Sequence, residues 1–347
     1  MVRSLFVLVL SLCVRVSVAA SAACSIQHAA ATELYVWLVC DQKNLLITAD
    51  QGATWQTRHL PVDVKLRSVA FLDSRRGFIV GDTGTLLATE DGAETWQKVP
   101  IPTPENLTAI HFIRELGWIA GWTGIILHSR DGGRTWERQQ SGIQQGLESI
   151  FFADSEHGWA VGRLGTILRT TDGGKTWSKV QTPGTLWSLD SVYFRDTKEG
   201  WVVGFGGQIL RSVDGGVTWR ERPSPVRAWL KSIVFDGSDR WWVATDDLLL
   251  VSSDNGENWR TVPIESTVFV HQVLPVGDSL WAVGQFGILK QTGDGVALTA
   301  LATLPDAGRL GVQTENEAQT NFGIVAKNGY LRRSGNGRCH RTPALSG

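Results

Sequence analysis

Seven aspartates recur at nearly constant spacing and are the first residues in this chain whose type could do chemistry. They are Asp50, Asp91, Asp131, Asp172, Asp214, Asp254 and Asp294, separated by 41, 40, 41, 42, 40 and 40 residues. Carboxylates can bind metal ions or act as general acids and bases. Each of these aspartates stands alone in its own segment, however, and one carboxylate cannot assemble a coordination shell. We therefore predict a structural role for all seven.

The residues around each aspartate follow one pattern, Ser/Thr-x-Asp-x-Gly-x-Thr-Trp, which is clearest at residues 129–136 and 170–177. This pattern is the Asp-box known from bacterial neuraminidase repeats. An Asp that opens a tight turn accepts hydrogen bonds from backbone N–H groups two or three residues on. The Gly that follows allows a positive φ, and the Trp starts the next strand, where it can pack on a neighbouring sheet. At Asp294 the pattern is worn and the Trp is missing.

A sialidase-like glycoside hydrolase is the enzymatic alternative, because Asp-boxes also occur in sialidases. Such an enzyme needs paired acidic groups, a Tyr nucleophile, three arginines and an Arg-Ile-Pro segment. No Arg-Ile-Pro occurs here, and Tyr35, Tyr193 and Tyr330 all lie inside strand patterns. Glu148 and Asp190 could be a carboxylate pair, yet each fills an ordinary polar position of a strand. Metal-ligand spacing and phosphate-binding Gly loops are also absent, so we predict no enzyme activity, no metal and no cofactor.

Two further blocks recur ahead of each Asp-box and predict the elements that position it. One is a Gly-Trp-x-x-Gly strand with a Gly turn and a second strand, as in residues 158–170, which is typical of a hairpin. The other is an alternating Leu-x-Ser-Val/Ile-x-Phe strand, as in residues 147–152. Together with the strand that begins at the Asp-box Trp, they give four strands per unit. Four-stranded units repeating near 41 residues are typical of β-propeller blades, and blade-to-blade packing explains most of the 16 tryptophans, which recur at two positions per unit.

The number of blades follows from how often the central hairpin recurs. It ends near Cys40, Gly81, Gly121, Gly162, Gly204, Thr245, Gly284 and Ala326. Residues 24–347 divided by eight give about 40.5 residues, close to the period, whereas seven would require about 46. We therefore favour eight blades in a single domain over residues 24–347. The alternative is seven blades, with an end unit joined into a shared blade.

One polar residue per inner strand falls two positions ahead of the central Val or Ile. These residues are Arg67, Thr108, Glu148, Asp190, Lys231 and His271. Strand alternation gives them a common facing. They form either a solvated rim or a polar mouth that docks a segment of an exported protein. Trp187 and Trp229 lie outside the repeat positions, just before inner strands, and either cap a blade or supply exposed contacts beside the charges.

Residues 1–23 are typical of a secretory signal. Arg3 supplies a positive charge, residues 5–14 form an apolar run, and residues 18–23 are the small residues that precede a cleavage site. The run is too short to span a bilayer of about 30 Å, and no later segment approaches 18 apolar residues. We expect an exported chain in the periplasm, or in the thylakoid lumen of a photosynthetic organism. The formal net charge of −1 argues against a nucleic-acid partner.

Three cysteines follow the expected signal segment, an odd number for an oxidising compartment. Cys40 and Cys339 lie near the two ends of the repeat array, so we consider a disulfide between them that clasps the ring. Cys24 follows Ser-Ala-Ala. It either carries a lipid, which would give membrane contact, or remains a free thiol, because the position three before it is Ser21 where a lipobox usually has Leu.

The sequence of residues 158–177 and 200–219, Gly-Trp-x-Val-Gly-x-x-Gly-x-Ile-Leu-x-x-x-Asp-Gly-Gly-x-Thr-Trp, resembles the photosystem II stability/assembly factor family. The resemblance covers nearly the whole chain after residue 23. It implies a lumenal, non-enzymatic propeller that escorts a newly made reaction-centre protein during assembly. Members are usually described as seven-bladed, and relatives also occur as exported proteins of non-photosynthetic bacteria. The resemblance therefore predicts a protein partner, either exported or in a membrane, within a complex under assembly.

Overall fold

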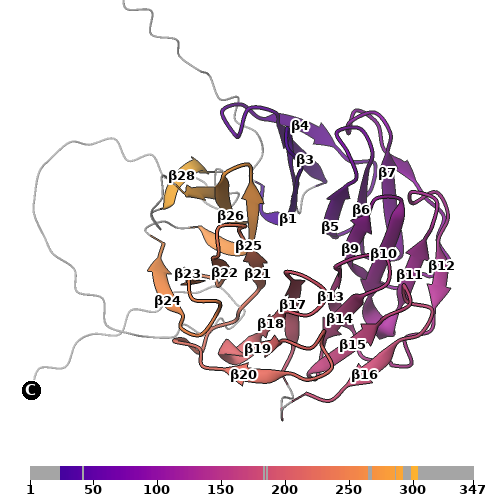
Figure 1. Cartoon of the computed structure of the whole chain (residues 1–347). Coiled ribbons are helices and arrows are strands. Elements are labelled where there is room, and N and C mark those ends of the chain that lie inside the picture. Colours follow the sequence, from indigo (N-terminus) through magenta and orange to yellow (C-terminus); the bar gives the residue numbers. More distant parts are fainter. Residues whose placement is uncertain are drawn as a thin grey trace, which may run out of the picture. The chain divides into compact units, whose positions relative to one another are not determined.

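Each repeat folds into one four-stranded antiparallel sheet in which the strands follow one another in chain order. The computed structural model describes residues 24–303 except 41–42, 183, 185–186, 265–267, 286 and 292–297. Within these residues seven sheets stand side by side as the blades of a propeller (Figure 1). The expected signal segment, residues 1–23, lies outside the described residues.

The seven blades, each given from its innermost to its outermost strand, are as follows. The first three contain β1 (Ile26–Ala31), β2 (Val36–Cys40), β3 (Asn44–Thr48) and β4 (Gln56–His59); β5 (Leu66–Phe71), β6 (Gly77–Gly81), β7 (Thr85–Thr89) and β8 (Gln97–Lys98); and β9 (Leu107–Ile113), β10 (Leu116–Gly121), β11 (Ile126–Ser129) and β12 (Glu137–Gln139). The fourth and fifth contain β13 (Leu147–Phe152), β14 (Gly158–Gly162), β15 (Thr166–Thr170) and β16 (Ser178–Val180); and β17 (Leu189–Phe194), β18 (Gly200–Gly204), β19 (Ile209–Ser212) and β20 (Arg220–Arg222). The last two contain β21 (Ser232–Phe235), β22 (Trp241–Ala244), β23 (Leu248–Ser252) and β24 (Arg260–Pro263); and β25 (Phe269–Val276), β26 (Ser279–Gln285), β27 (Gly287–Gln291) and β28 (Leu298–Thr303). Two short 3-10 turns, η1 (Trp122–Gly124) and η2 (Phe205–Gly207), follow β10 and β18.

The propeller has seven blades, so the expectation of eight is wrong. The period of 40 residues is met by seven units over residues 24–303, and including residues 304–347 in the division produced the wrong count. The eighth hairpin, expected near Ala326, lies outside the described residues. The seven-blade alternative also differs from the structure in one respect, because the first blade is β1–β4 and the last is β25–β28, and within residues 24–303 no strand from one chain end joins the blade of the other.

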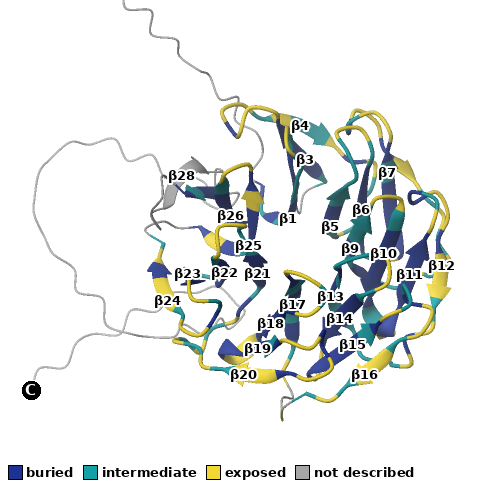
Figure 2. Ribbon diagram, in the orientation of Figure 1, coloured by how far each residue is buried: buried dark blue, intermediate teal, exposed yellow. Residues whose placement is uncertain are grey.

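The two middle strands of each blade carry the core. All five residues of β14 and of β18 are buried, whereas β12 and β16 expose two of their three residues. Figure 2 shows this gradient, with the middle strands dark blue and β12, β16 and β20 largely yellow. Because the middle strands are covered by a neighbouring blade on each face, they are apolar throughout instead of alternating.

Aromatic side chains from two blades meet at most blade interfaces. Trp118 of the third blade stacks on Phe152 of the fourth at 3.6 Å, and Trp177 of the fourth meets Phe152 edge-on at 5.8 Å. The same arrangement recurs as Trp37–Phe71–Trp96 and Trp159–Phe194–Trp219. Offset stacking and edge contacts are the favoured geometries of aromatic pairs. The packing role predicted for the repeated tryptophans is therefore confirmed.

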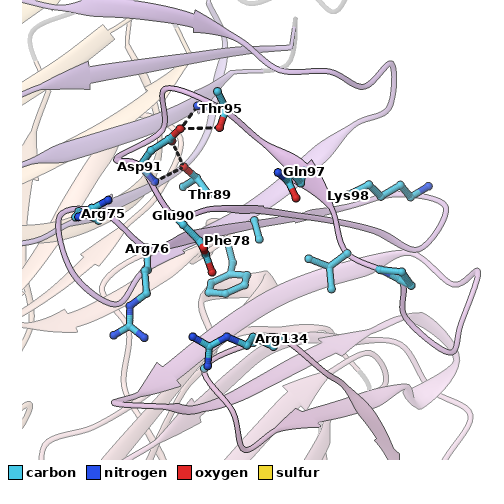
Figure 3. Close-up of a pocket in the computed structure, with 15 residues that line it drawn as sticks. Arg75, Arg76, Phe78, Thr89, Glu90, Asp91, Thr95, Gln97, Lys98 and Arg134 are labelled. Carbon is cyan, nitrogen blue, oxygen red and sulfur yellow. Dashed lines mark hydrogen bonds between the residues drawn. The ribbon is translucent and has the colours of Figure 1, made fainter.

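The Asp-box turn is held by one carboxylate, as Figure 3 shows for Asp91. Its two oxygens accept hydrogen bonds from the Thr89 hydroxyl (2.8 Å) and from the Thr95 backbone N–H (2.9 Å) and hydroxyl (2.6 Å). The backbone donor lies four residues on, whereas two or three were expected, because the box is wider than a simple Asx turn. Gly92 has the predicted positive φ of 78°. The same backbone hydrogen bond to the carboxylate recurs in the six described boxes, and Asp294 lies outside the described residues.

The ring closes between the first and last blades by contacts that join β1 to β25 and β26. The Gln272 side chain accepts a hydrogen bond from the Ala29 N–H (2.8 Å) and donates one to the Ala29 carbonyl (3.1 Å). Ser25 also forms an isolated antiparallel bridge with Gln285. These contacts thus hold the first and last blades together, as a shared strand would in other propellers.

A disulfide joins Cys24 to Cys40, with a Cα–Cα distance of 5.3 Å. The expected Cys40–Cys339 clasp is therefore wrong. The register of the first hairpin explains the pairing, since Ile26 lies opposite Cys40 and brings Cys24 beside it. The Cys24 sulfur is neither a free thiol nor available to carry a lipid. Cys339 itself lies outside the described residues.

Candidate binding site at the central channel

Seven polar side chains, one from each blade, are turned toward the central channel near the start of the inner strands. In six blades the residue is the extra residue of a β-bulge, opposite no partner on the second strand. In the sixth blade Lys231 directly precedes β21 and donates its N–H to the Ala244 carbonyl. A bulge re-aims a side chain out of the regular alternation. The seven residues are Gln27, Arg67, Thr108, Glu148, Asp190, Lys231 and His271, which we call the mouth residues.

The channel contains a cavity of about 590 Å³ whose lining includes all seven mouth residues. The six that the sequence predicts to lie at one level are therefore brought together. Gln27 was missed because β1, Ile-Gln-His-Ala-Ala-Ala, lacks the Leu-x-Ser-Val/Ile pattern of the other inner strands. Its position one residue after the first apolar residue of the strand was the signal that could have found it.

Three of the four charged mouth residues are paired with ions of opposite sign. Arg67 makes a two-pronged ion pair with Asp82, and Lys231 pairs with Asp246. Glu148 accepts a hydrogen bond from Arg163 at 3.0 Å. The positive charges that the sequence singled out are thus largely neutralised within the protein.

Trp122, in η1, lies between two of these cations. The guanidinium groups of Arg67 and Arg163 lie 5.4 and 5.0 Å from the centre of its ring. Cations are attracted to the face of an indole at such distances. On the side of the mouth formed by the second to fourth blades, the charged side chains are therefore paired with one another and packed on the Trp122 ring.

Asp190 differs from the other charged mouth residues. Its Oδ2 is buried and has no hydrogen-bond partner among the described residues, and its Oδ1 has only a long contact with the Ser188 hydroxyl, at 3.5 Å. Burial, with a smaller contribution from nearby Glu148, raises the pKa of Asp190 to about 6. The indole of Trp229 favours the charged form but makes no well-formed hydrogen bond to Oδ2.

Histidines add polarity to the channel without adding charge at neutral pH. Burial lowers the pKa of His28, His111 and His271 to about 4 in each case. The ammonium of Lys231 lies 3.1 Å from Nδ1 of His271 and donates to it, which also favours the neutral ring. The net charge of the mouth is accordingly set by the carboxylates and the two cations.

An exposed aromatic cluster lies on the same face as the mouth. Trp187 and Trp229 are 57% and 44% exposed, and Phe205 between them is 43% exposed. The centre of the Phe205 ring lies 5.2 Å from that of Trp187 and 6.0 Å from that of Trp229. Trp187 precedes β17 and Phe205 follows β18, and these two strand ends are paired, so the cluster borders the start of the inner strands. Phe205 was missed because it occupies an ordinary turn position of the repeat.

A second cavity, of about 550 Å³, lies between the outer parts of the second and third blades. Figure 3 shows the Asp91 turn at one end and the Arg76 and Arg134 side chains at the other. Arg76 is held by Asp73 at 2.8 Å and by Glu115 at 2.9 Å. These contacts fasten turns, and they do not bring an acid, a base and a nucleophile together.

Among the described residues, no group of three or more His, Cys, Asp or Glu side chains is placed to hold a metal ion. No helix in the described part of the chain is long and apolar enough to cross a membrane.

Solved structures with the same fold include assembly factors and enzymes. A structure described as YCF48 bound to D1 peptide is 21% identical, with a TM-score of 0.60, and the match covers 71% of this chain and 83% of that one. YCF48 from Cyanidioschyzon merolae is 16% identical, with a TM-score of 0.65 and coverage of 78% and 95%. The GH74 enzyme of Niastella koreensis is 13% identical, with a TM-score of 0.66 and coverage of 82% and 55%. At these identities the likeness shows the fold.

The family comparison is more specific. No curated protein matches the chain. The BNR/Asp-box repeat profile matches residues 168–179. The profile described as Photosynthesis system II assembly factor YCF48 matches residues 47–144 and 179–269, which is more than half of the chain. The chain therefore belongs to the family of the photosystem II assembly factor YCF48.

Proposed function

We propose that this protein is an exported, non-enzymatic scaffold that holds a segment of another protein while a membrane complex is assembled. The observation that carries the proposal is the exposed aromatic cluster of Trp187, Phe205 and Trp229 beside a polar channel mouth. Large exposed apolar patches on soluble proteins mark interaction sites, and Trp is enriched among residues that dominate binding energy. Membership in an assembly-factor family and a fold relative described as bound to a D1 peptide support a polypeptide ligand.

The test is capture of partners by crosslinking in the native envelope, followed by pull-down. Replacing both Trp187 and Trp229 by Ala should reduce the yield of a specific crosslinked partner at least tenfold, because two anchors of this kind each contribute 1–2 kcal/mol or more to binding. The matched control replaces Leu34 and Val213, which are 69% and 63% exposed and lie in the turns after β1 and β19, away from the starts of the inner strands. Equal capture by both double variants would place the binding surface elsewhere. Normal yields of assembled complexes in a deletion strain would contradict the assembly role.

A glycoside hydrolase is the competing function, favoured by two observations. Glu148 and Asp190 both line the channel cavity, and GH74 enzymes share the fold. Against it, Glu148 is tied to Arg163, and Tyr193 packs against Phe151 at 4.9 Å with its pKa raised by burial, which disfavours a nucleophilic phenolate. Purified protein should not turn over aryl glycosides or sialosides. Turnover that Asp190→Asn or Tyr193→Phe abolishes would establish the enzyme instead.

A further inference from the structure

Among the described residues, one carboxylate of the channel mouth, that of Asp190, forms no contact ion pair. The cavity lining holds four ionised side chains, of which Arg67, Glu148 and Lys231 each have an ion partner. Asp190 forms no ion pair within 4 Å among the described residues, although the nearby charge of Lys231 favours its ionised form, and its Oδ2 makes no hydrogen bond. A buried carboxylate without compensation is costly. A positively charged group in contact with Asp190 would therefore stabilise its ionised carboxylate.

The aromatic cluster adjoins that carboxylate. The Trp229 indole lies close enough to Asp190 to favour its ionised form. The centre of the Trp229 ring is 5.3 Å from the Lys231 ammonium, so Trp229 borders both mouth residues. Phe205 and Trp187 extend the apolar surface outward from Trp229. A long cationic side chain matches such a surface, since its methylene stem lies on aromatic rings while its head reaches a carboxylate.

We propose, on the basis of the binding function above, that the mouth takes a basic, apolar polypeptide segment. One Lys or Arg side chain of the segment enters beside Asp190, and an adjacent apolar side chain packs on Trp187, Phe205 and Trp229. An acidic segment fits less well, because the two cations of the mouth are already engaged by Asp82 and Asp246.

Binding of a cation beside Asp190 favours its ionised form and so is linked to pH. The charged groups around Asp190 are Glu148 on β13 and Lys231 before β21, with His271 on β25 next to Lys231. His271 stays neutral from pH 5 to 7 because its pKa is about 4. With the pKa of free Asp190 at about 6, only about a tenth of it is ionised at pH 5. The affinity for a basic segment should therefore fall about tenfold between pH 7 and pH 5.

The experiment measures fluorescence anisotropy of three labelled decapeptides with the full chain after removal of residues 1–23. The peptides are acetylated and amidated and differ only at the centre, which is Phe-Lys-Leu, Phe-Gln-Leu or Phe-Glu-Leu. We expect the Lys peptide to bind most tightly at pH 7 and to lose about tenfold in affinity at pH 5. The Gln peptide should bind more weakly, with little dependence on pH. Asp190→Asn should remove the advantage of Lys over Gln and most of the pH effect.

The control variant is Asp239→Asn, an exposed carboxylate in the turn between β21 and β22, which should leave all affinities unchanged. Thermal unfolding of each variant checks that it is folded. Three results would overturn the proposal: tightest binding of the Glu peptide, no effect of Asp190→Asn, or no binding of any peptide. If crosslinked capture still depends on Trp187 and Trp229 in that case, the basic segment is wrong while the scaffold function stands. Loss of that dependence as well would reject both.

Discussion

Glu199 shows how one buried carboxylate fastens two neighbouring blades. It is only 7% exposed and accepts hydrogen bonds from Arg195, from Arg211 at 2.6 Å and 3.0 Å, and from the side-chain amide of Asn255 at 2.9 Å. Asn255 belongs to the Asp-box of the sixth blade, whereas the other residues belong to the fifth. The carboxylate therefore neutralises two arginines and also holds the next blade's turn in place.

Removal of the Glu199 charge should be far more costly than removal of a similar exposed one. Glu199→Gln leaves Arg211 poorly compensated in a buried setting, and we expect a loss of about 3 kcal/mol in the free energy of unfolding. Glu257→Gln is the matched control. Glu257 also pairs with Arg211, but its side chain is 51% exposed, so less than about 1 kcal/mol should be lost. Urea unfolding followed by Trp fluorescence measures both, and equal losses would mean that burial does not govern this network.

The Asp-box carboxylates make stability sensitive to acid. The pKa values of Asp50, Asp91 and Asp131 are lowered to about 2, first by the hydroxyl of the Thr four residues on; that of Asp254 is lowered equally, first by the Asn258 backbone N–H. A pKa that is lower in the folded state gives stabilisation that is complete above the unfolded value of about 4. That stabilisation is lost as the pH falls toward 2.

The melting temperature should therefore be steady from pH 7 to about pH 5 with respect to these groups, and should fall steeply between pH 4 and pH 2. Asp131→Asn should lower it at pH 7 and reduce the difference between pH 7 and pH 2, because one of the linked protons is gone. A circular-dichroism melt series measures this. An unchanged pH dependence in the variant would show that the boxes do not couple to folding.

At the scale of elements, hydrogen bonds cross from blade to blade along the inner strands. In six of the seven blades the residue after the mouth position accepts a hydrogen bond from a backbone N–H of the next inner strand, as Ser191 does from Ile233 (3.2 Å) and Ser232 does from Val273 (3.3 Å). His28, Ser68, Ser149 and Gln272 do the same. Inner strands have an edge with no fifth strand to pair with. These side chains satisfy part of that edge and account for the Ser in the repeat.

The third blade is an exception that gives a test. Its residue at this position is Ala109, and Thr108 instead donates to the Leu147 carbonyl of the fourth blade, at 2.7 Å. Ser191→Ala should lower the free energy of unfolding by about 1 kcal/mol, since one hydrogen bond is lost. Ala109→Ser should raise it by up to about 1 kcal/mol by supplying the missing acceptor. Chemical denaturation measures both, and a destabilising Ala109→Ser would show that the third interface is too tight for a hydroxyl.

The repeat made much of this scale predictable. The Leu-x-Ser-Val/Ile-x-Phe pattern located five inner strands, and aligning them placed six of the seven mouth residues correctly. The bulge that turns those residues toward the channel was not predictable, because a bulge is defined by register against a second strand and leaves no mark on one strand alone. Phe205 was missed for a related reason, since its exposure depends on which loops of the adjoining blades lie beside it.

At the scale of the whole molecule, the two wrong predictions, the number of blades and the disulfide pairing, concern how the ring of blades closes. The sequence has a clear period but carries no signal for where the array stops, so counting to residue 347 added a blade. The Cys40–Cys339 pairing followed from the same assumption that the array runs to the end of the chain. The actual partner, Cys24, lies beside Cys40 through the pairing of one hairpin, a local constraint that spacing alone could not distinguish.

Reduction of the Cys24–Cys40 disulfide should destabilise the propeller. Chain-entropy arithmetic for a loop of this size, with a sequence separation of 16, gives about 3 kcal/mol. Dithiothreitol should therefore lower the melting temperature by several degrees, and the Cys24→Ser/Cys40→Ser variant should melt at the reduced value with or without reductant. A separate Gln272→Ala variant should lose about 1–3 kcal/mol, because two hydrogen bonds to Ala29 disappear. A melting temperature that does not respond to reduction would show that the disulfide does not stabilise the first blade. An unchanged free energy of unfolding in Gln272→Ala would show that ring closure depends on apolar packing.

Among the described strands none is shared between the first and last blades, and this arrangement has a consequence for how the chain folds. Each blade is encoded by a continuous stretch of about 40 residues, so β1–β4 can pair as soon as they emerge from synthesis and need not wait for the chain's other end. Within each blade the strands that pair are neighbours in the chain, which favours their rapid pairing. The step that spans most of the chain is the meeting of the first blade with the last, in which Ala29 contacts Gln272, 243 residues away, and Ser25 bridges Gln285. We therefore expect the blades to form one after another as the chain emerges, with the first blade joining the last at the end, as docking of two surfaces that have already formed.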